Sequence, residues 1–191
     1  VLKECCILAS KGFKEIVLTG IHTGMYNYDG KDLTDLIYDI SSIKGIERVR
    51  LSSVEITELS DKFLNMLKDN KVFCDHLHVP LQTGCDKMLK VMNRKYDLEY
   101  YENKIKEIRK IRPDISITTD VIVGHNKETE KDFQNTYEFC QKINFAKIHV
   151  FPYSKRTGTK SSFMDEEVSE KDKKDRTKRL IELKLVGCYN R

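Results

Sequence analysis

The sequence has no tryptophan, only three prolines, and neither a CxxC pair nor a closely spaced triad among its six cysteines. No apolar run approaches the roughly 18–20 residues that a membrane-spanning helix needs, so we expect no membrane span in it. Hydrophobic residues make up 39% and charged residues 34% of the 191 residues, a balance that excludes a disordered chain. We therefore expect a single globular domain with a sizeable buried core.

The cysteines lack the spacing that metal and cluster sites use. They form no CxxC pair and no closely spaced triad, and no secretory signal accompanies them, so we expect reduced thiols, most of them filling the core, and a cytoplasmic location. The six are Cys5, Cys6, Cys74, Cys85, Cys140 and Cys188. Because the sequence opens inside an expected helix and carries no targeting segment, we expect a piece of a longer protein.

The charge is unevenly distributed along the chain. Residues 155–191 hold 11 basic and 7 acidic residues, which accounts for the whole net charge of +4. A mildly basic tail suits a polyanionic partner. Charge alone favours a plainer interpretation, which is a solvated helix face.

Short runs rich in isoleucine and valine alternate with helical patterns. The expected strands are Glu15–Gly20, Arg48–Val54, His76–Leu81, Ile115–Gly124 and Ala146–Tyr153. The expected helices are Leu2–Lys11, Leu33–Ile43, Ser60–Lys68, Asp86–Met92, Leu98–Ile111, Glu130–Ile143 and Val168–Leu185. This alternation predicts an α/β fold of right-handed βαβ units around a parallel sheet, as an open or partial barrel or a doubly wound sheet. The near-continuous apolar runs predict strands that are covered on both faces.

Polar residues follow the expected strands at their C-terminal ends, where the sites of parallel α/β folds form. We therefore expect a polar ligand site there. Its candidate residues are Thr19, Gly20, His22, Ser52, Ser53, Glu55, His76, His78, Gln82, Thr83, Gly84, Thr119, Asp120, Gly124, Glu128, His149, Tyr153, Ser154 and Arg156.

Several residues in this set could have a purely structural role instead of a role in a ligand site. His76 and His78 share one face of a strand and could bind a metal, although satisfied core histidines are at least as common. Asp120 lies inside an apolar strand, so it needs either a structural hydrogen bond or a role in the site. Ser53 could instead make a hydrogen bond at a strand end, and the carboxylate of Glu55 could simply face solvent. Gly124 could belong to a plain turn.

Five segments occur in the order and spacing of one enzyme family. They are LTGIHTGMYNYDG (18–30), RLSSVE (50–55), HLHVPLQTGCDKMLKVMNRKY (76–96), ITTDVIVG (117–124) and HVFPYSKRTGT (149–159). Together they resemble the radical S-adenosylmethionine (SAM) methylthiotransferases that modify tRNA, and the likeness covers nearly the whole chain. Residues Thr19–His22 resemble the branch acting on threonylcarbamoyladenosine, since the isopentenyladenosine branch usually has Gln-Asn there.

The resemblance implies a partial (β/α)6 TIM-like radical SAM barrel, from its first helix through its sixth strand. Residues 1–160 would form this partial barrel, and residues 161–191 a helical segment leading to an RNA-binding domain that the sequence does not include. The implied cofactors are SAM and 4Fe–4S clusters, whose CxxxCxxC ligands would lie outside this fragment. The fragment alone is therefore expected to be inactive, and tRNA is its implied partner.

The resemblance also implies roles for individual residues, without assigning a catalytic side chain or a metal ligand. Cofactor-binding residues would be Thr19, Gly20, Ser53, Glu55, Gln82, Thr83, Asp120, Ile122, Gly124 and Tyr153. Substrate-binding residues would be His22, His78, Arg94, Ser154 and Arg156. The loop Gly124–Thr129 lacks the proline and the second glycine that the family usually has there.

The favoured function is thus the core of a tRNA methylthiotransferase. In the implied reaction a radical takes hydrogen from the adenine ring carbon between the two ring nitrogens, and a methylated sulfur replaces it. Two alternatives stay open. One is a non-catalytic relic or binding fragment of the same barrel. The other is a metal-dependent barrel hydrolase that uses His76, His78, His149 and Asp120.

Overall fold

The structure is a computed structural model that describes residues 1–155, 158, 164 and 166–183. It divides into two compact units. The first comprises Val1–Val79 and Lys104–Ile117, and the second comprises Pro80–Asn103 and Thr118–Arg191. None of the described helices is long and apolar enough to cross a membrane.

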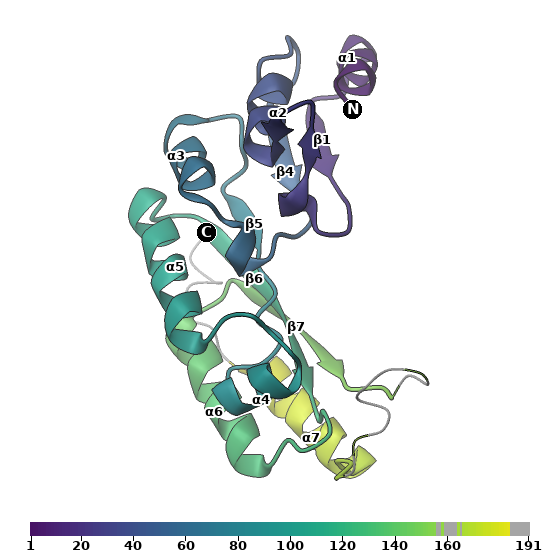
Figure 1. Cartoon of the computed structure of the whole chain (residues 1–191), viewed down its shortest axis with the longest axis vertical. Helices are drawn as coiled ribbons and strands as arrows, with labels where there is room; N and C mark the ends of the chain where they lie inside the picture. The colour runs from purple at the N-terminus through teal and green to yellow at the C-terminus, as the bar shows by residue number, and fades with distance from the viewer. Residues whose placement is uncertain (156–157, 159–163, 165, 184–191) are drawn as a thin grey trace. The chain divides into compact units, whose positions relative to one another are not determined.

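The first unit is built on a pair of parallel strands (Figure 1). Strand β1 (Glu15–Leu18) pairs with β4 (Arg48–Leu51), and Ile16 lies opposite Val49 in the register. The other elements of this unit are α1 (Leu2–Ser10), η1 (Thr23–Met25), β2 (Asn27–Tyr28), β3 (Lys31–Asp32), α2 (Leu33–Ser41), η2 (Ile56–Glu58), α3 (Asp61–Asp69), β5 (His76–His78) and the C-terminal part of α5 (Leu98–Ile111).

Helix α2 shows why these segments fold as expected. It begins at a capping box, in which the N–H groups of Asp32 and Asp35 each donate to the other residue's carboxylate at 3.0 Å. Its buried apolar residues recur at helical spacing and are Leu33, Leu36, Ile37 and Ile40. Each large aliphatic side chain buried in this way contributes about 1.5–3 kcal/mol, so the apolar stripe holds the helix against its neighbours.

One element is absent from the sequence-based expectation. Asn27 pairs with Asp32 and Tyr28 with Lys31 in a short antiparallel hairpin around Asp29-Gly30. Both turn residues have positive φ, +53° and +75°, as a two-residue type I′ turn requires. The strands that flank this turn are too short to leave an alternating pattern in the sequence.

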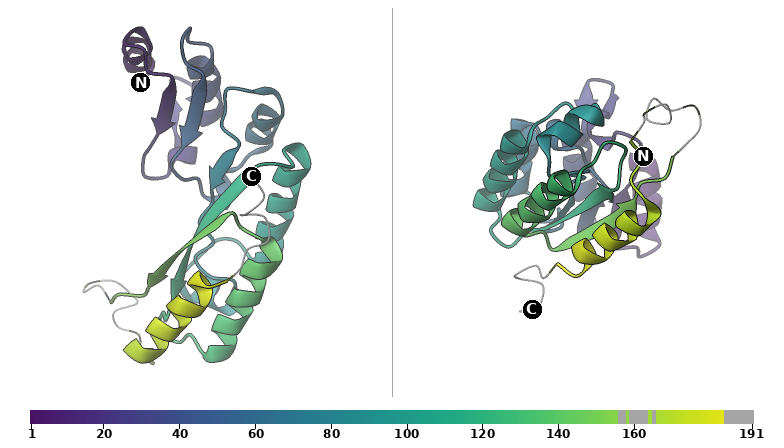
Figure 2. Two further views of the ribbon diagram at one scale, coloured as in Figure 1. Left: turned by 180° about the vertical axis from the view of Figure 1, so that it is seen from behind. Right: turned by 90° about the horizontal axis from the view of Figure 1, so that it is seen from below.

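The second unit places helices against another parallel pair. Strand β6 (Ser116–Val123) pairs with β7 (Lys147–Pro152), and Thr119 lies opposite Ile148 in the register. The helices are α4 (Asp86–Val91), the start of α5, α6 (Glu130–Ile143) and α7 (Glu170–Ile181). Figure 2 shows α7 lying alongside both α6 and β7. In the core the Tyr101 ring meets Phe139 and Phe145 edge to face, each at 6.3 Å between ring centroids.

The burial of these strands differs from the expectation. In β6 fully buried residues alternate with half-exposed ones, and Asp120 and Ile122 are on the half-exposed face. Strand β7 contains no fully buried residue. The prediction that strands are covered on both faces is therefore wrong for β6 and β7. Successive side chains point to opposite faces of a strand, so helices packed on one face leave the other accessible.

The expected strands and helices are all present, with ends that differ by a few residues. The last helix illustrates the difference. The sequence predicts it at Val168–Leu185, but Ser169 is its N-cap and Ile181 is its last described helical residue, while residues 184–185 lie outside the described part of the chain. The α/β class with parallel strand pairing is confirmed.

Candidate functional site

The loop after β1 forms a hollow of about 350 Å³ in the first unit. Polar and main-chain groups line one part of it and apolar side chains the rest. The lining residues are Val1, Leu18, Thr19, Gly20, Ile21, His22, Thr23, Met25, Tyr26, Leu33 and Leu36. A concave, largely apolar surface with a few polar groups suits a small amphiphilic ligand.

Glu58 holds this loop in shape. Its Oε2 accepts the N–H groups of Gly24 and Glu55, each at 3.2 Å, and its Oε1 lies 3.4 Å from Nδ1 of His22. The Glu58 side chain is 7% exposed, whereas that of His22 is 65% exposed and free to meet a ligand. Glu58 is not among the predicted residues, because an isolated glutamate 34 residues from Gly24 gives no local signal of this contact.

Hydrogen bonds join this loop to the segment after β4, which holds the predicted residues Ser53 and Glu55. The Thr23 hydroxyl donates to the carbonyl oxygen of Ser53 at 2.6 Å, which joins the segment after β4 to the hollow. His22 has a left-handed backbone with φ +53°, so its side chain leaves the loop in an unusual direction. His78 is half-buried at the end of β5, and its carbonyl accepts the Val54 N–H at 3.1 Å.

In the second unit Gln82 occupies a strained position. Its φ of +67° is uncommon for a residue other than glycine. Its N–H donates to the Asp120 carbonyl, and its own carbonyl accepts the Ile122 N–H, both at 2.8 Å. These bonds fix Gln82 beside β6. Strain of this kind clusters at functional sites, where the surrounding structure enforces it.

Thr83, a predicted cofactor contact, packs inside the second unit. Its side chain is fully buried, and its hydroxyl lies 3.1 Å from the hydroxyl of Thr136 on α6. The next residue, Gly84, donates its N–H to the same Thr136 oxygen at 3.1 Å. A buried hydroxyl needs a hydrogen bond, and Thr83 obtains one by packing against the helix.

The loop after β6 contains a buried ion pair. The Gly124 N–H donates to Glu128 Oε2 at 2.6 Å, and Arg176 Nη1 on α7 donates to the same oxygen at 2.7 Å. The side chains of Glu128 and Arg176 are 1% and 6% exposed. Burial raises the pKa of Glu128, although the Gly124 N–H and Arg176 oppose that change. The shape of this loop therefore depends on a cation from another helix.

Tyr153 follows β7 next to this loop. Its N–H donates to the Val123 carbonyl at 2.8 Å, and its ring packs on His125 with 4.5 Å between centroids. Lys173 Nζ lies 5.9 Å from the centre of the Tyr153 ring. The phenol oxygen is buried and meets no hydrogen-bond partner among the described residues. Such an oxygen fits a polar atom of a bound ligand, which agrees with the predicted cofactor role.

The other predicted residues are less informative. Ser154 is exposed, Arg94 is half-buried after α4, and Arg156 lies outside the described residues. Burial, with help from Arg50 and His78, lowers the pKa of His76. Among the described residues no group of three or more His, Cys, Asp or Glu side chains could hold a metal ion. The metal hydrolase alternative therefore has no support in the described part of the chain.

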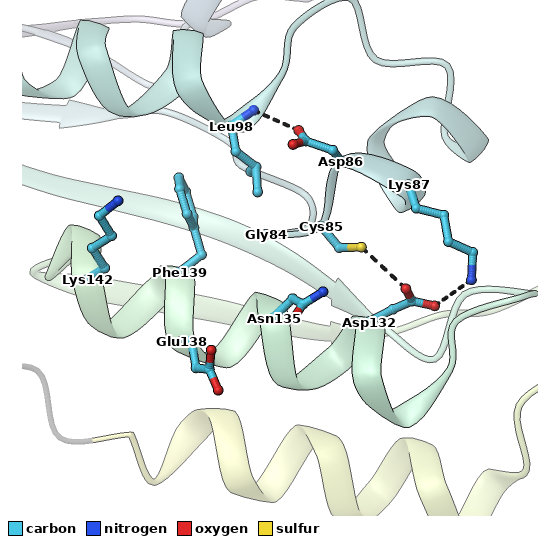
Figure 3. Close-up of a pocket in the computed structure, with 10 residues that line it drawn as sticks. All are labelled: Gly84, Cys85, Asp86, Lys87, Leu98, Asp132, Asn135, Glu138, Phe139 and Lys142. Atoms are coloured by element: carbon cyan, nitrogen blue, oxygen red, sulfur yellow. Dashed lines mark hydrogen bonds and ion pairs between the residues drawn. The ribbon is translucent and has the colours of Figure 1, made fainter.

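A second hollow of about 470 Å³ lies between α4 and α6 (Figure 3). Cys85 Sγ donates to Asp132 Oδ1 at 3.4 Å, and Lys87 Nζ donates to Asp132 Oδ2 at 2.7 Å. Burial would raise the pKa of Asp132, but Lys87, Thr129 and Cys85 outweigh it and lower this pKa to about 2. Because these charges are already paired within the protein, we interpret this hollow as a packing groove between helices.

The described cysteines do not fit an iron–sulfur cluster. Cys5, Cys85 and Cys140 are buried, and Cys6 is exposed. Burial raises the pKa of the Cys140 thiol to about 12, whereas a cluster ligand must be a thiolate. No three cysteines within the described ranges come together. Any cluster ligands must therefore come from residues other than these.

Comparison with known sequences shows the family. The radical SAM superfamily pattern matches residues 1–140. The chain is 41% identical to "Threonylcarbamoyladenosine tRNA methylthiotransferase MtaB" of Bacillus subtilis, over 96% of this chain and 41% of that protein. It is 42% identical to "tRNA-2-methylthio-N(6)-dimethylallyladenosine synthase" of Acetivibrio thermocellus, over 95% of this chain and 38% of that protein. The chain thus spans about two fifths of the length of these relatives.

Two solved structures share the fold. Coproporphyrinogen III oxidase HemN of Escherichia coli, described as a radical SAM enzyme, superimposes with a TM-score of 0.72 and 17% identity, over 94% of this chain and 43% of that one. Streptococcus suis SuiB, solved with its precursor peptide SuiA, gives a TM-score of 0.55 and 13% identity over 86% and 34%. The predicted fold, a fragment of a radical SAM barrel, is therefore confirmed.

The cofactors that this superfamily uses, SAM and a 4Fe–4S cluster, are the ones that the sequence predicts. The amphiphilic hollow at Thr19 and Gly20 in the first unit suits SAM, and the orphaned Tyr153 hydroxyl in the second suits a polar atom of a ligand. The cluster has no site among the described cysteines. From the match over residues 1–140, together with the shared fold, we conclude that this chain belongs to the radical SAM superfamily.

Proposed function

We propose that this chain is the central barrel of a tRNA methylthiotransferase. The enzyme would add a methylthio group to N6-threonylcarbamoyladenosine next to the anticodon. The observation that carries this proposal is 41–42% identity to enzymes of this kind over more than nine tenths of the chain. Because the chain spans only about two fifths of those relatives, the activity is that of the longer enzyme. The fragment alone is proposed to be inactive, because its described cysteines form no cluster site.

We propose SAM contacts within each unit, taken by itself. Thr19 and Gly20 line the hollow in the first unit. Asp120 and Ile122 share the half-exposed face of β6 in the second. The remaining proposed cofactor contacts are Ser53, Glu55, Gln82, Thr83, Gly124 and Tyr153. When bound, the cofactors supply the radical chemistry, while these side chains and main-chain groups bind, orient and exclude water.

The proposed macromolecular partner is tRNA, and the proposed location is therefore the cytoplasm. The target adenine must leave its base stack to be reached, as in other enzymes that modify bases. His22, His78, Arg94, Ser154 and Arg156 are the proposed substrate contacts. Three exposed lysines of α7, Lys171, Lys174 and Lys178, would add a salt-dependent attraction to phosphates.

The choice between two nucleoside substrates rests on a short segment. Relatives named for threonylcarbamoyladenosine and for dimethylallyladenosine are equally similar to this chain, at 41% and 42% identity. We favour threonylcarbamoyladenosine because residues Thr19–His22 resemble that branch. These residues also line the hollow of the first unit, where a difference between branches would affect binding.

Mass spectrometry of tRNA nucleosides tests the proposal in the organism that carries the gene. Deleting the gene should abolish the 2-methylthio form of threonylcarbamoyladenosine and leave the unmodified precursor, and a reintroduced copy should restore it. Loss of the methylthio group from the isopentenyladenosine nucleoside instead would assign the other substrate. An unchanged nucleoside profile would refute the function and favour the non-catalytic alternative.

A further inference from the structure

Helix α7 reaches the loop after β6 through one buried cation. Arg176 Nη1 donates to the Glu128 carboxylate at 2.7 Å and to the Glu128 carbonyl at 3.1 Å, while Nε donates to Glu130 at 3.3 Å. Its guanidinium carbon lies 5.7 Å from the centre of the Phe133 ring. A single side chain of α7 thus contacts the end of the loop and the first turn of α6.

The same helix also covers the other end of the loop. Gly124 has φ +74°, and a Cβ placed there would lie 2.3 Å from Cγ of Lys173. Lys173 is buried along its stem, and its ammonium group pairs with Glu170 at 2.8 Å. The close approach of Lys173 therefore requires glycine at position 124. Helix α7 contacts the loop at both Gly124 and Glu128.

Glu128 joins these two contacts. Its Oε2 receives both the Gly124 N–H and Arg176, while its Oε1 has no hydrogen-bond partner among the described residues. Leaving a buried carboxylate without its cation strongly destabilises the folded state. Without Arg176, Glu128 would have to take up a proton or swing out to water. Either change weakens the acceptor that fixes the Gly124 N–H.

We propose that Arg176 is a positioning residue for the cofactor site. It holds Glu128, which fixes the backbone of Gly124, so that the order of α7 sets the shape of the loop at the end of β6. This inference rests on the proposed function, in which Ile122 and Gly124 contact SAM. None of the contacts that carry it involves a predicted substrate residue, and no local sequence motif marks Arg176.

The contacts of Arg176 with Glu128 and of Glu128 with Gly124 together are called the latch here. Hydrogen exchange measured by mass spectrometry tests the latch without any cofactor. Exchange in the segment 124–130 should become about tenfold faster in Arg176→Met, the loss expected for one charge-assisted hydrogen bond. Arg179→Met is the matched control, because Arg179 pairs with Glu130 and stacks on Phe133 from the same helix but is 36% exposed. Exchange in that control should match the parent chain.

A rescue variant keeps this test decisive. A neutral glutamine at position 128 needs no cation yet still offers an oxygen to the Gly124 N–H. Adding Glu128→Gln to Arg176→Met should therefore restore most of the lost protection. Unchanged exchange in Arg176→Met, or the same increase in Arg179→Met, would overturn the latch.

Steady-state kinetics of the full-length enzyme test the positioning role. Arg176→Met should raise the KM for SAM at least about tenfold, while the rate at saturating SAM stays near that of the parent. Ile40→Val, a fully buried change in the first unit, controls for a general loss of stability and should leave the KM unchanged. Faster exchange in the loop together with an unchanged KM for SAM would refute the positioning role of Arg176. If the parent enzyme uses neither SAM nor tRNA, the proposed function fails, and hydrogen exchange still decides the latch.

Discussion

The two buried carboxylates of the second unit differ because their partners differ. Burial raises the pKa of Glu128 even though Arg176 lies beside it. Asp132 receives hydrogen bonds from Lys87 and from both the N–H and the hydroxyl of Thr129, and its pKa falls to about 2. Three strong donors outweigh the cost of burial at Asp132, whereas the donors at Glu128 do not.

Asp132 should therefore make folding depend on acid pH. Its pKa is lower in the folded chain, about 2 against an ordinary 3.8, so its contribution is present above about pH 4 and is lost as the pH falls through 2. The difference corresponds to about 2 kcal/mol. Urea unfolding of Asp132→Asn should show a loss of that size at neutral pH and a flatter pH dependence below pH 4.

Glu138→Gln is the control for this measurement, because Glu138 is an exposed carboxylate of the same helix. It should keep both the neutral stability and the acid loss of the parent. If Asp132→Asn loses stability in acid as steeply as the parent, the acid dependence arises elsewhere.

Replacing Gly124 with alanine should cost more stability than the same change at Gly12, a glycine with a similar backbone conformation. Gly124 and Gly12 both have positive φ, +74° and +89°, but a Cβ at Gly12 meets nothing within 4 Å. Gly12→Ala should therefore show only the cost of a left-handed backbone, about 1–2 kcal/mol. Gly124→Ala should cost clearly more by urea unfolding, because the Lys173 stem must also move. Equal losses in the two variants would show that the close contact has no energetic weight.

At the scale of helices and strands, the sequence predicts those elements that are long enough to show a hydrophobic period. Helix α6 has the predicted bounds, Glu130–Ile143, because a threonine cap and an amphipathic stripe mark them. The β2–β3 hairpin escapes prediction since two residues per strand leave no period. Arg112 escapes it too, although it joins three segments of the first unit, because most of its partners are main-chain carbonyls, which have no sequence signature.

Arg112 should stabilise the first unit strongly. From the end of α5 its guanidinium donates to the carbonyls of Leu67, Asn70 and Phe73, the last at 2.8 Å, and pairs with Asp75 at 2.8 Å. Lysine cannot reproduce this planar set of donors, so Arg112→Lys should cost about 2–3 kcal/mol in urea unfolding. Arg48→Lys, at an exposed ion pair with Glu15, should cost less than about 1 kcal/mol. Similar losses in both variants would contradict the role given to Arg112.

For the whole molecule, the order of the motifs identifies the family but not the contacts that shape the site. The segments around Thr19, Gln82 and Tyr153 stand out as candidates from the amino-acid sequence alone. The contact of the Thr83 hydroxyl with Thr136 could not be predicted, because a hydroxyl in such a motif looks the same whether it faces a ligand or a helix. Glu58 and Arg176 escape prediction because their partners are 34 and 48 residues away, at separations where single-sequence patterns carry no information.

The cysteines form no cluster motif, and their arrangement also predicts that the isolated chain will not assemble an iron–sulfur cluster. Cys5, Cys85 and Cys140 are buried, and because burial raises the pKa of Cys5 and Cys140, those two thiols resist the deprotonation that iron binding requires. Anaerobic treatment of the 191-residue chain with iron and sulfide should therefore yield neither the visible absorbance nor the bound iron of a 4Fe–4S centre. A four-iron ferredoxin reconstituted in parallel is the positive control. A stable four-iron centre on this chain would mean that its cysteines rearrange into a site, and the proposal that the fragment alone is inactive would lose its basis.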